Sequence, residues 1–270
     1  MPDADGARAD HLTRDAELLK QTVRDAGALG LSLFRTTLKM WTKGGTSPVS
    51  EADIAVNDLI QSRLQAATPD YGWLSEESAD DESRLGKNLT WIIDPIDGTR
   101  GYLAGREDWC VSVALVEGAR PLLAAVFAPS TDEFFFAVRG EGTTLNGTPI
   151  HAASGTALDY PRIAGPKPLV ERLARPLQDI TLYPRIGSLA LRLCWAASGK
   201  LDAAFAGGQS RDWDLAAANL IVQEAGGRMT ALSGEAIAYN RREVAHGVLV
   251  AAGRDRHARI VEHFRDRPLR

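Results

Sequence analysis

The sequence predicts a mixed α/β protein made of two abutting halves, an α+β half at residues 1–151 and an α/β half at residues 152–270. In the first half, successive apolar runs separated by short turns predict an antiparallel meander. In the second half, predicted strands and helices alternate, which is typical of α/β folds. No sequence repeat of 20–50 residues occurs, which argues against a solenoid.

Composition and charge narrow the class of protein. The chain is 44% apolar and 24% charged with a net charge of −4, so neither a nucleic acid polymer nor an anionic membrane is an expected partner. No apolar run approaches the length of a membrane-spanning helix. Cys110 and Cys194 each lie in an apolar run, where we expect buried thiols rather than a disulfide. These features together predict a cytoplasmic protein.

Helical periodicity dominates the beginning of the chain. Residues 1–9 are expected to be a frayed arm, and residues 10–41 a helix that Gly27 or Gly30 could interrupt. The stretch Ser50-Glu51-Ala52-Asp53 fits a capping box and predicts the start of a second helix.

The remaining elements of the first half follow in order: a loop at 43–48, a short strand at 71–74, an acidic loop to 87, a buried strand at 91–93, and meander strands at 110–116, 122–127 and 133–138. Proline cannot donate to a strand ladder, so we expect the buried strand to end at Asp94-Pro95. Asn146-Gly147 predicts a tight hairpin.

The second half predicts four helices and three strands. The helices are expected at 168–174, 189–197, 212–225 and 254–266, and the strands at 201–205, 228–231 and 247–251. Gly226-Gly227 is suited to end the third of these helices.

Two carboxylates follow the buried strand. Asp94 and Asp97 lie three residues apart, and Gly98 and Thr99 then offer backbone N–H groups at a reversal of the chain. Paired acids beside such amides suit a phosphate bridged by Mg²⁺, which prefers oxygen ligands. The alternative is a solvated Asp-Pro turn without a ligand.

Two further acidic stretches could complete this site. Glu76-Glu77 follows the predicted strand at 71–74, but its alternative is an acidic surface loop. Asp212 and Asp214 open a predicted helix, and their alternative is plain helix capping.

Taken together, these stretches resemble the inositol monophosphatase superfamily, whose members are Mg²⁺-dependent, lithium-sensitive phosphatases of small molecules. The matching motifs occur in the family's order: Glu76-Glu77, then Asp94-Pro95-Ile96-Asp97-Gly98-Thr99, then Trp213-Asp214-Leu215-Ala216. The resemblance implies a layered αβαβα sandwich and a homodimer.

The resemblance also implies roles for individual residues. One Mg²⁺ would be held by Glu76, Asp94 and the Ile96 carbonyl, a second by Asp94, Asp97 and Asp214, and a third, weaker ion would lie near Glu76. Gly98 and Thr99 would bind the phosphate through their amides. Thr99 and Glu76 would orient and deprotonate the attacking water, and Asp53 would accept a hydrogen bond from Thr99. The metals would offset the charge of the ester, so that no covalent intermediate is needed.

The substrate is less closely defined by the motifs. Family members that prefer inositol monophosphate carry a glutamate where this chain has Gly207, which argues against that substrate. The stretches around Lys43–Asp53 and Gly98–Tyr102 look more like the 3'(2'),5'-bisphosphate nucleotidase branch. We therefore expect adenosine 3',5'-bisphosphate first, with inositol 1-phosphate or histidinol phosphate as alternatives. Cationic candidates for a second phosphate are Lys43, Arg100, Arg106, Arg185 and Arg211.

A protein of another class, a non-catalytic ligand-binding protein on the same fold, is the remaining alternative. None of the motif acids is lost, and Thr99 is present, which favours the enzyme.

Overall fold

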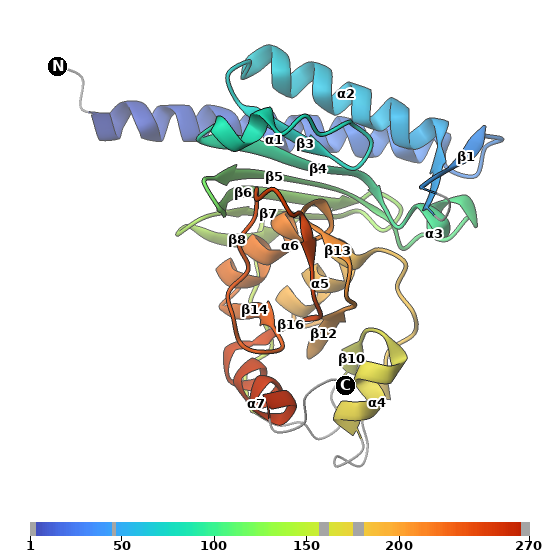
Figure 1. Cartoon of the computed structure of the whole chain (residues 1–270), viewed down its shortest axis with the longest axis vertical. Helices are drawn as coiled ribbons and strands as arrows, with labels where there is room; N and C mark the ends of the chain where they lie inside the picture. The colour runs from blue at the N-terminus through green and yellow to red at the C-terminus, as the bar shows by residue number, and fades with distance from the viewer. Residues whose placement is uncertain (1–3, 45–46, 157–161, 175–180, 266–270) are drawn as a thin grey trace.

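The computed structural model describes residues 4–44, 47–156, 162–174 and 181–265, and its elements form five layers in the order αβαβα (Figure 1). Two long helices cover the outer face of a large sheet. Two further helices separate that sheet from a smaller one. Another pair of helices, not consecutive in the chain, covers the outer face of the smaller sheet. The layered sandwich expected from the motifs is therefore confirmed.

The large sheet has seven strands in the order β3-β4-β5-β6-β7-β8-β9. Its strands are β3 (Gly72–Ser75), β4 (Leu89–Asp97), β5 (Cys110–Glu117), β6 (Arg120–Ala128), β7 (Glu133–Val138), β8 (Gly142–Leu145) and β9 (Thr148–Pro149). Only β3 and β4 run parallel, and the other neighbours are antiparallel, as the predicted meander requires. Asn146 and Gly147 both have positive φ, of 50° and 81°, and form the expected tight hairpin between β8 and β9.

Strand β5 shows how the large sheet serves two cores. Its side chains alternate between the faces, so Val111, Val113 and Leu115 pack toward the outer helices. Cys110 and Ala114 belong to the other core, between the two sheets. A strand that is buried on both faces reads as a continuous apolar run, as this one does.

The second half supplies the smaller sheet and the helices on its two faces. Its strands run in the order β11-β10-β12-β16-β14. They are β10 (Arg162–Ala164), β11 (Thr181–Leu182), β12 (Ala203–Ala206), β14 (Gly227–Ala231) and β16 (Leu249–Gly253). Helices α5 (Leu189–Ala197) and α6 (Asp212–Glu224) lie between the sheets, while α4 (Lys167–Ala174) and α7 (Arg254–Arg265) pack outside. All four helices match the predicted ones within two residues at each end, apart from residue 266, which lies outside the described residues. The division into domains at residue 151 stays a prediction.

The first helix differs from its prediction. Helix α1 (Ala4–Leu33) begins within the expected frayed arm and ends eight residues before residue 41. It passes through Gly27 and Gly30 without a break. A Cβ on Gly27 would lie 2.3 Å from Cδ1 of Phe127, and one on Gly30 would lie 3.0 Å from the Trp109 ring. These glycines therefore permit close packing of α1 on the large sheet.

The segment after α1 also differs from its prediction. Strands β1 (Met40–Lys43) and β2 (Ser47–Ser50) form an antiparallel hairpin where a helix end and a loop were expected. Residues 45 and 46 of the expected loop lie outside the described residues. The capping box is confirmed, because the Ser50 and Asp53 side chains and backbones are bonded reciprocally at the start of α2 (Glu51–Ala67).

Strand β4 does not end at Asp94-Pro95. It continues to Asp97 through a bulge, in which Asp94 pairs with Ser112 and Asp97 pairs with Cys110. A bulge leaves one residue outside the ladder, so Pro95 is tolerated there although it has no N–H group. The prediction that proline terminates this strand was wrong for this reason.

Several short elements were not predicted. Among them, strands β13 (Ser210–Arg211) and β15 (Ala245–His246) pair beside the start of α6, and the short helix η1 (Ser83–Gly86) interrupts the acidic loop. Within the described ranges, no helix combines the length and apolarity that crossing a membrane requires.

Candidate active site

Three carboxylates from distant parts of the chain converge at one end of the large sheet. Glu76 directly follows β3, Asp94 lies in β4 and Asp214 lies in the first turn of α6. One oxygen from each lies within 4.8 Å of the others. Because β3 and β4 are parallel neighbours, their carboxyl ends meet at the same edge, and α6 brings the third acid to that edge.

The environment of these acids fits a hard divalent cation. Asp94 Oδ1 is buried and has no hydrogen-bond partner among the described residues. Burial, and next the charge of Glu76, raise the pKa of Asp94 well above its usual range. Burial, and next the charge of Asp97, do the same to the pKa of Asp214. Buried carboxylates in mutual repulsion are stabilised by a bound cation, and Mg²⁺ prefers such oxygen ligands.

Glu76 has a pKa close to neutrality. Burial, followed by the charges of Glu77 and Asp97, raises the pKa of Glu76 to about 7. A carboxyl group with such a pKa exchanges protons readily near neutral pH.

Asp97 lines the same cleft but lies outside the group of three. Its Oδ2 accepts hydrogen bonds from the Ser188 hydroxyl at 2.6 Å and from the Ala190 amide at 2.5 Å. Asp97 thus stabilises the N-terminus of α5, where a negative charge also suits the helix dipole. Ser188, the N-cap of α5, was missed as a site residue. Its signal in the sequence was a serine directly before the apolar run at 189–197.

Thr99 and Asp53 are directly bonded. The Thr99 hydroxyl lies 3.0 Å from Asp53 Oδ1 and 2.9 Å from the Ile96 carbonyl oxygen. Asp53 is held in turn by the capping box, because its Oδ2 accepts from the Ser50 amide at 2.8 Å. Burial raises the pKa of Asp53, although its hydrogen bonds oppose the shift. The capping box therefore fixes the acceptor that orients Thr99.

Gly98 occupies a position that excludes a side chain. Its φ is 98°, and a Cβ would lie 3.0 Å from the Ser188 amide nitrogen and 3.2 Å from the Asp108 carbonyl oxygen. Gly98 is the N-cap of the short helix α3 (Thr99–Leu103). The first amides of a helix lack partners within it, so the amide of Thr99 remains available beside the carboxylates.

Lys43 reaches the site from the β1–β2 hairpin. Its Nζ donates to the Glu76 carbonyl oxygen and lies 3.6 Å from Glu77 Oε2. The hairpin thus brings a positive charge to the Glu76-Glu77 stretch, which is not a solvated acidic loop at this point.

A cleft of about 470 Å³ joins these groups. Its described lining comprises Ser47, Pro48, Glu76, Asp94, Ile96, Asp97, Gly98, Thr99, Arg100, Gly101, Arg106, Arg185, Gly187 and Asp214. Three arginines lie in this lining, and all three are exposed. Such a volume suits a small-molecule ligand.

Gly207 and Arg211, which the sequence also offered as substrate contacts, are not among the described residues that line the cleft, and their role stays a prediction. The Arg211 guanidinium lies 3.8 Å from Glu243, and its amide donates to Asp214 Oδ2 at 2.6 Å. Arg211 thus contacts a carboxylate of the site through its backbone.

Comparisons with known proteins agree with this geometry. The model of the inositol monophosphatase family matches residues 11–269. Inositol monophosphatase 1 of Solanum lycopersicum is 33% identical over 233 residues, covering 82% of this chain and 85% of that protein. Nus factor SuhB of Xylella fastidiosa is 37% identical over 203 residues, covering 71% of each. The solved structure of the IMPase of Thermotoga maritima superposes with a TM-score of 0.79 at 26% identity, covering 95% of this chain and 97% of that one.

Proposed function

Because the chain belongs to the inositol monophosphatase family, we propose that it hydrolyses the phosphate monoester of a small metabolite with Mg²⁺ held by Glu76, Asp94 and Asp214. The chain is a metal-dependent phosphoric monoester hydrolase, as its family relationship requires. The observation that carries the assignment of the site is the convergence of three carboxylates, one of which, Asp94, has a buried Oδ1 without a partner among the described residues.

Each residue of the site has a role that follows from its contacts. When bound, Mg²⁺ would offset the negative charge of the ester and lower the pKa of a nearby water. The Thr99 hydroxyl has a single proton, and donating it to Asp53 leaves the oxygen lone pairs to accept from that water. Glu76 borders the same site and would take up the proton of that water. The amides of Gly98 and Thr99 would hold the phosphate oxygens.

Two substrates are supported by different observations. The relatives described above carry the names inositol monophosphatase and Nus factor SuhB rather than bisphosphate nucleotidase. We therefore put inositol 1-phosphate first, which reverses the order that the motifs suggested. Adenosine 3',5'-bisphosphate remains the second candidate, because Arg100, Arg106 and Arg185 line the cleft and could bind a second phosphate.

A panel of phosphate esters tests both the activity and this order. Phosphate release is measured from inositol 1-phosphate, adenosine 3',5'-bisphosphate and histidinol phosphate, with Mg²⁺ and with a chelator. We expect release only with Mg²⁺, inhibition by lithium, and the highest kcat/KM for inositol 1-phosphate. No Mg²⁺-dependent release from any of them would favour a non-catalytic ligand-binding protein instead.

Variants of Arg185 and Arg106 provide a matched test of the second candidate substrate, adenosine 3',5'-bisphosphate. The Arg106 guanidinium is bonded to Asp108 and to the Arg185 carbonyl oxygen, so it also has a structural role. Arg185→Gln should therefore raise KM for adenosine 3',5'-bisphosphate more than for inositol 1-phosphate, whereas Arg106→Gln should impair both. Equal effects of Arg185→Gln on the two esters would remove the argument for a second phosphate subsite.

The homodimer implied by the resemblance is kept as a proposal. Analytical ultracentrifugation tests it, and a sedimentation mass near the 29.1 kDa of one chain would contradict it.

A further inference from the structure

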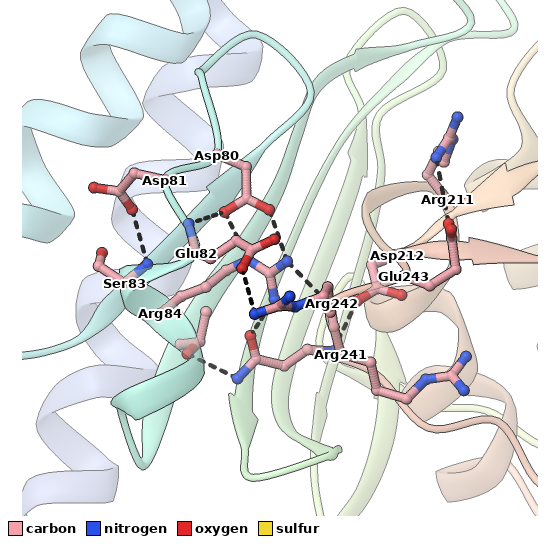
Figure 2. A network of polar contacts seen from close by, with 12 residues as sticks. Asp80, Asp81, Glu82, Ser83, Arg84, Arg211, Asp212, Arg241, Arg242 and Glu243 are labelled. Atoms are coloured by element: carbon pink, nitrogen blue, oxygen red, sulfur yellow. Dashed lines mark hydrogen bonds and ion pairs between the residues drawn. The ribbon is translucent and has the colours of Figure 1, made fainter.

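A polar network joins the acidic loop of the first half to the segment around Asn240 in the second half. Arg84 of η1 is completely buried, and its guanidinium is bonded to both oxygens of Asp80, at 3.0 and 2.7 Å. The same guanidinium donates to Asn240 Oδ1 at 2.8 Å and to the Arg241 carbonyl oxygen at 3.0 Å. Figure 2 shows Arg84 between the acidic loop and the segment that carries Arg241. Charge-assisted bonds that are buried in this way hold the two segments in a fixed register.

Asn240 is the centre of this network. Its Oδ1 accepts from Arg84, its Nδ2 donates to Thr90 Oγ1 at 3.2 Å, and its backbone N–H donates to Asp212 Oδ2 at 2.7 Å. Its φ is 54°, in the left-handed region that asparagine tolerates better than most residues. One residue therefore bonds η1, β4 and the start of α6.

Two of these segments carry the carboxylates of the site. Thr90 lies in β4 four residues before Asp94, and alternation along the strand places both on the same face. Asp212 lies two residues before Asp214 and is 1% exposed. Its other oxygen is bonded to His246 Nε2 at 2.6 Å, which fixes the start of α6 against β15. Asn240 thus links the strand of one carboxylate to the helix start of the other.

We propose that Asn240 is a positioning residue, which, through Thr90 and Asp212, sets the distance between Asp94 and Asp214 and thereby the affinity for a divalent cation. The inference rests on the proposed function, because it assumes that these two carboxylates share a metal. Arg84 holds the Asn240 side chain through its hydrogen bond to Oδ1, and the space that Arg84 and Thr90 occupy requires glycine at position 72. A Cβ on Gly72 would lie 2.5 Å from Thr90 Oγ1 and 2.9 Å from Arg84 Cβ.

The test uses Asn240→Gly, because glycine keeps the left-handed backbone and the bond to Asp212 but removes the bonds to Arg84 and Thr90. Mn²⁺ is the probe, and its dissociation constant is measured by electron paramagnetic resonance on the full chain. We expect Asn240→Gly to bind Mn²⁺ about 10-fold more weakly than the parent, the size of effect typical of residues that orient metal ligands. The Mg²⁺ concentration for half-maximal phosphate release should rise in parallel, with a smaller change in kcat at saturating Mg²⁺.

Asn146→Gly is the matched control. Asn146 also has a positive φ, of 50°, and its side chain is also bonded twice, to the Phe134 amide and to the Asp132 carbonyl oxygen. It lies in the β8–β9 hairpin, at the other edge of the seven-stranded sheet from β3. This variant should lose stability comparably and leave the affinity for Mn²⁺ unchanged.

A second variant covers the case in which Asn240→Gly does not fold. Thr90→Val keeps the size of the side chain and removes only the acceptor for Asn240 Nδ2, so it should weaken Mn²⁺ binding in the same direction by a smaller factor. Equal Mn²⁺ affinities in the parent and in the folded position-240 or position-90 variant would overturn the inference alone. An equal loss of Mn²⁺ affinity in Asn240→Gly and Asn146→Gly would also overturn the inference. A parent protein that does not bind Mn²⁺ would contradict both the inference and the proposed function.

Discussion

Asp94 and Asp97 face the same side of β4 although they lie three residues apart. Side chains alternate along a regular strand, so residues at this spacing would point to opposite faces. The bulge adds one residue to β4 between the pairs Asp94–Ser112 and Asp97–Cys110, and this restores the common face. The spacing of the two acids therefore suits a site only because the strand is irregular at Pro95.

The two aspartates should respond differently to the loss of their charge. Asp94→Asn should abolish turnover without unfolding the protein, because Asp94 Oδ1 has no partner in the described structure and its charge is opposed by neighbouring carboxylates. The melting temperature without metal should stay the same or rise, and the stabilisation by Mg²⁺ should disappear. Differential scanning fluorimetry with and without Mg²⁺, beside an assay of phosphate release, measures both effects. Near-normal activity of this variant would remove Asp94 from the metal site.

Asp97→Ala is the comparison. Asp97 accepts hydrogen bonds from Ser188 and Ala190 at the start of α5, so removing this acceptor should destabilise the protein by about 1 kcal/mol, as the loss of a helix cap does. Urea unfolding measures this difference. A variant as stable as the parent would show that the contact with α5 contributes nothing to stability.

Gly98→Ala should reduce both stability and activity. The new Cβ would meet the Ser188 amide at 3.0 Å, and the positive φ adds a cost of about 1–2 kcal/mol for an L-residue. Gly140→Ala is the control, because Gly140 has a φ of 84° but open space around the position of a Cβ. Both variants should carry the conformational cost, and only Gly98→Ala should also lose phosphate release. Equal activity of the two variants would show that close packing at Gly98 does not matter for the site.

Gly27→Ala should destabilise the protein although alanine favours a helix by about 1 kcal/mol over glycine. A Cβ would lie 2.3 Å from the Phe127 ring, and overpacking of this kind costs about 1–3 kcal/mol. Adding Phe127→Leu should recover part of the loss that Gly27→Ala causes, because the two changes act on one contact. Urea unfolding of the single and double variants measures the coupling. Purely additive changes in the free energy of unfolding would show that the destabilisation by Gly27→Ala does not arise from contact with Phe127.

His257 should make stability depend on pH. Burial, followed by the charge of Arg228, lowers the pKa of His257 to about 4, below its usual value of 6.5. As the pH falls, the unfolded chain therefore takes up the proton before the folded protein does. The contribution of neutral His257 to the free energy of unfolding is complete above pH 6.5 and is lost as the pH falls toward 4. The loss amounts to at most about 3 kcal/mol.

His257→Gln isolates this contribution. Glutamine can keep a hydrogen bond to Thr230 Oγ1, which lies 2.9 Å from His257 Nε2, but it does not titrate. The free energy of unfolding of the variant should fall less between pH 6.5 and 4 than that of the parent. Parallel curves for the two proteins would contradict the lowered pKa.

Local features of the sequence were sufficient for much of the fold. The capping box at Ser50–Asp53, the apolar runs of the meander and the Asn146-Gly147 turn depend on interactions within a few residues, so they can be read from the chain. The same holds for the acid after β3 and the acids at the end of β4. Their order and spacing identified the family, and Asp214 was expected at the start of a helix, where the structure has it.

Contacts between distant segments were decided by the tertiary structure. The β1–β2 hairpin, the passage of α1 through Gly27, and the bulge at Pro95 each oppose a local preference, and packing against other elements outweighs that preference. Glycine within a helix costs about 1 kcal/mol, which is less than the packing that its absent side chain permits here.

The contacts of each acid came from the tertiary structure. The resemblance assigned Glu76 and Asp94 to one ion and Asp94, Asp97 and Asp214 to another, and that assignment stays a prediction. The fold brings Glu76, Asp94 and Asp214 close together and turns one oxygen of Asp97 toward α5. Buried charges require partners, and which partner is within reach depends on segments about a hundred residues away. The sequence by itself therefore determined which chemical groups form the site, and the packing of β4 against α5 and α6 determined what each group contacts.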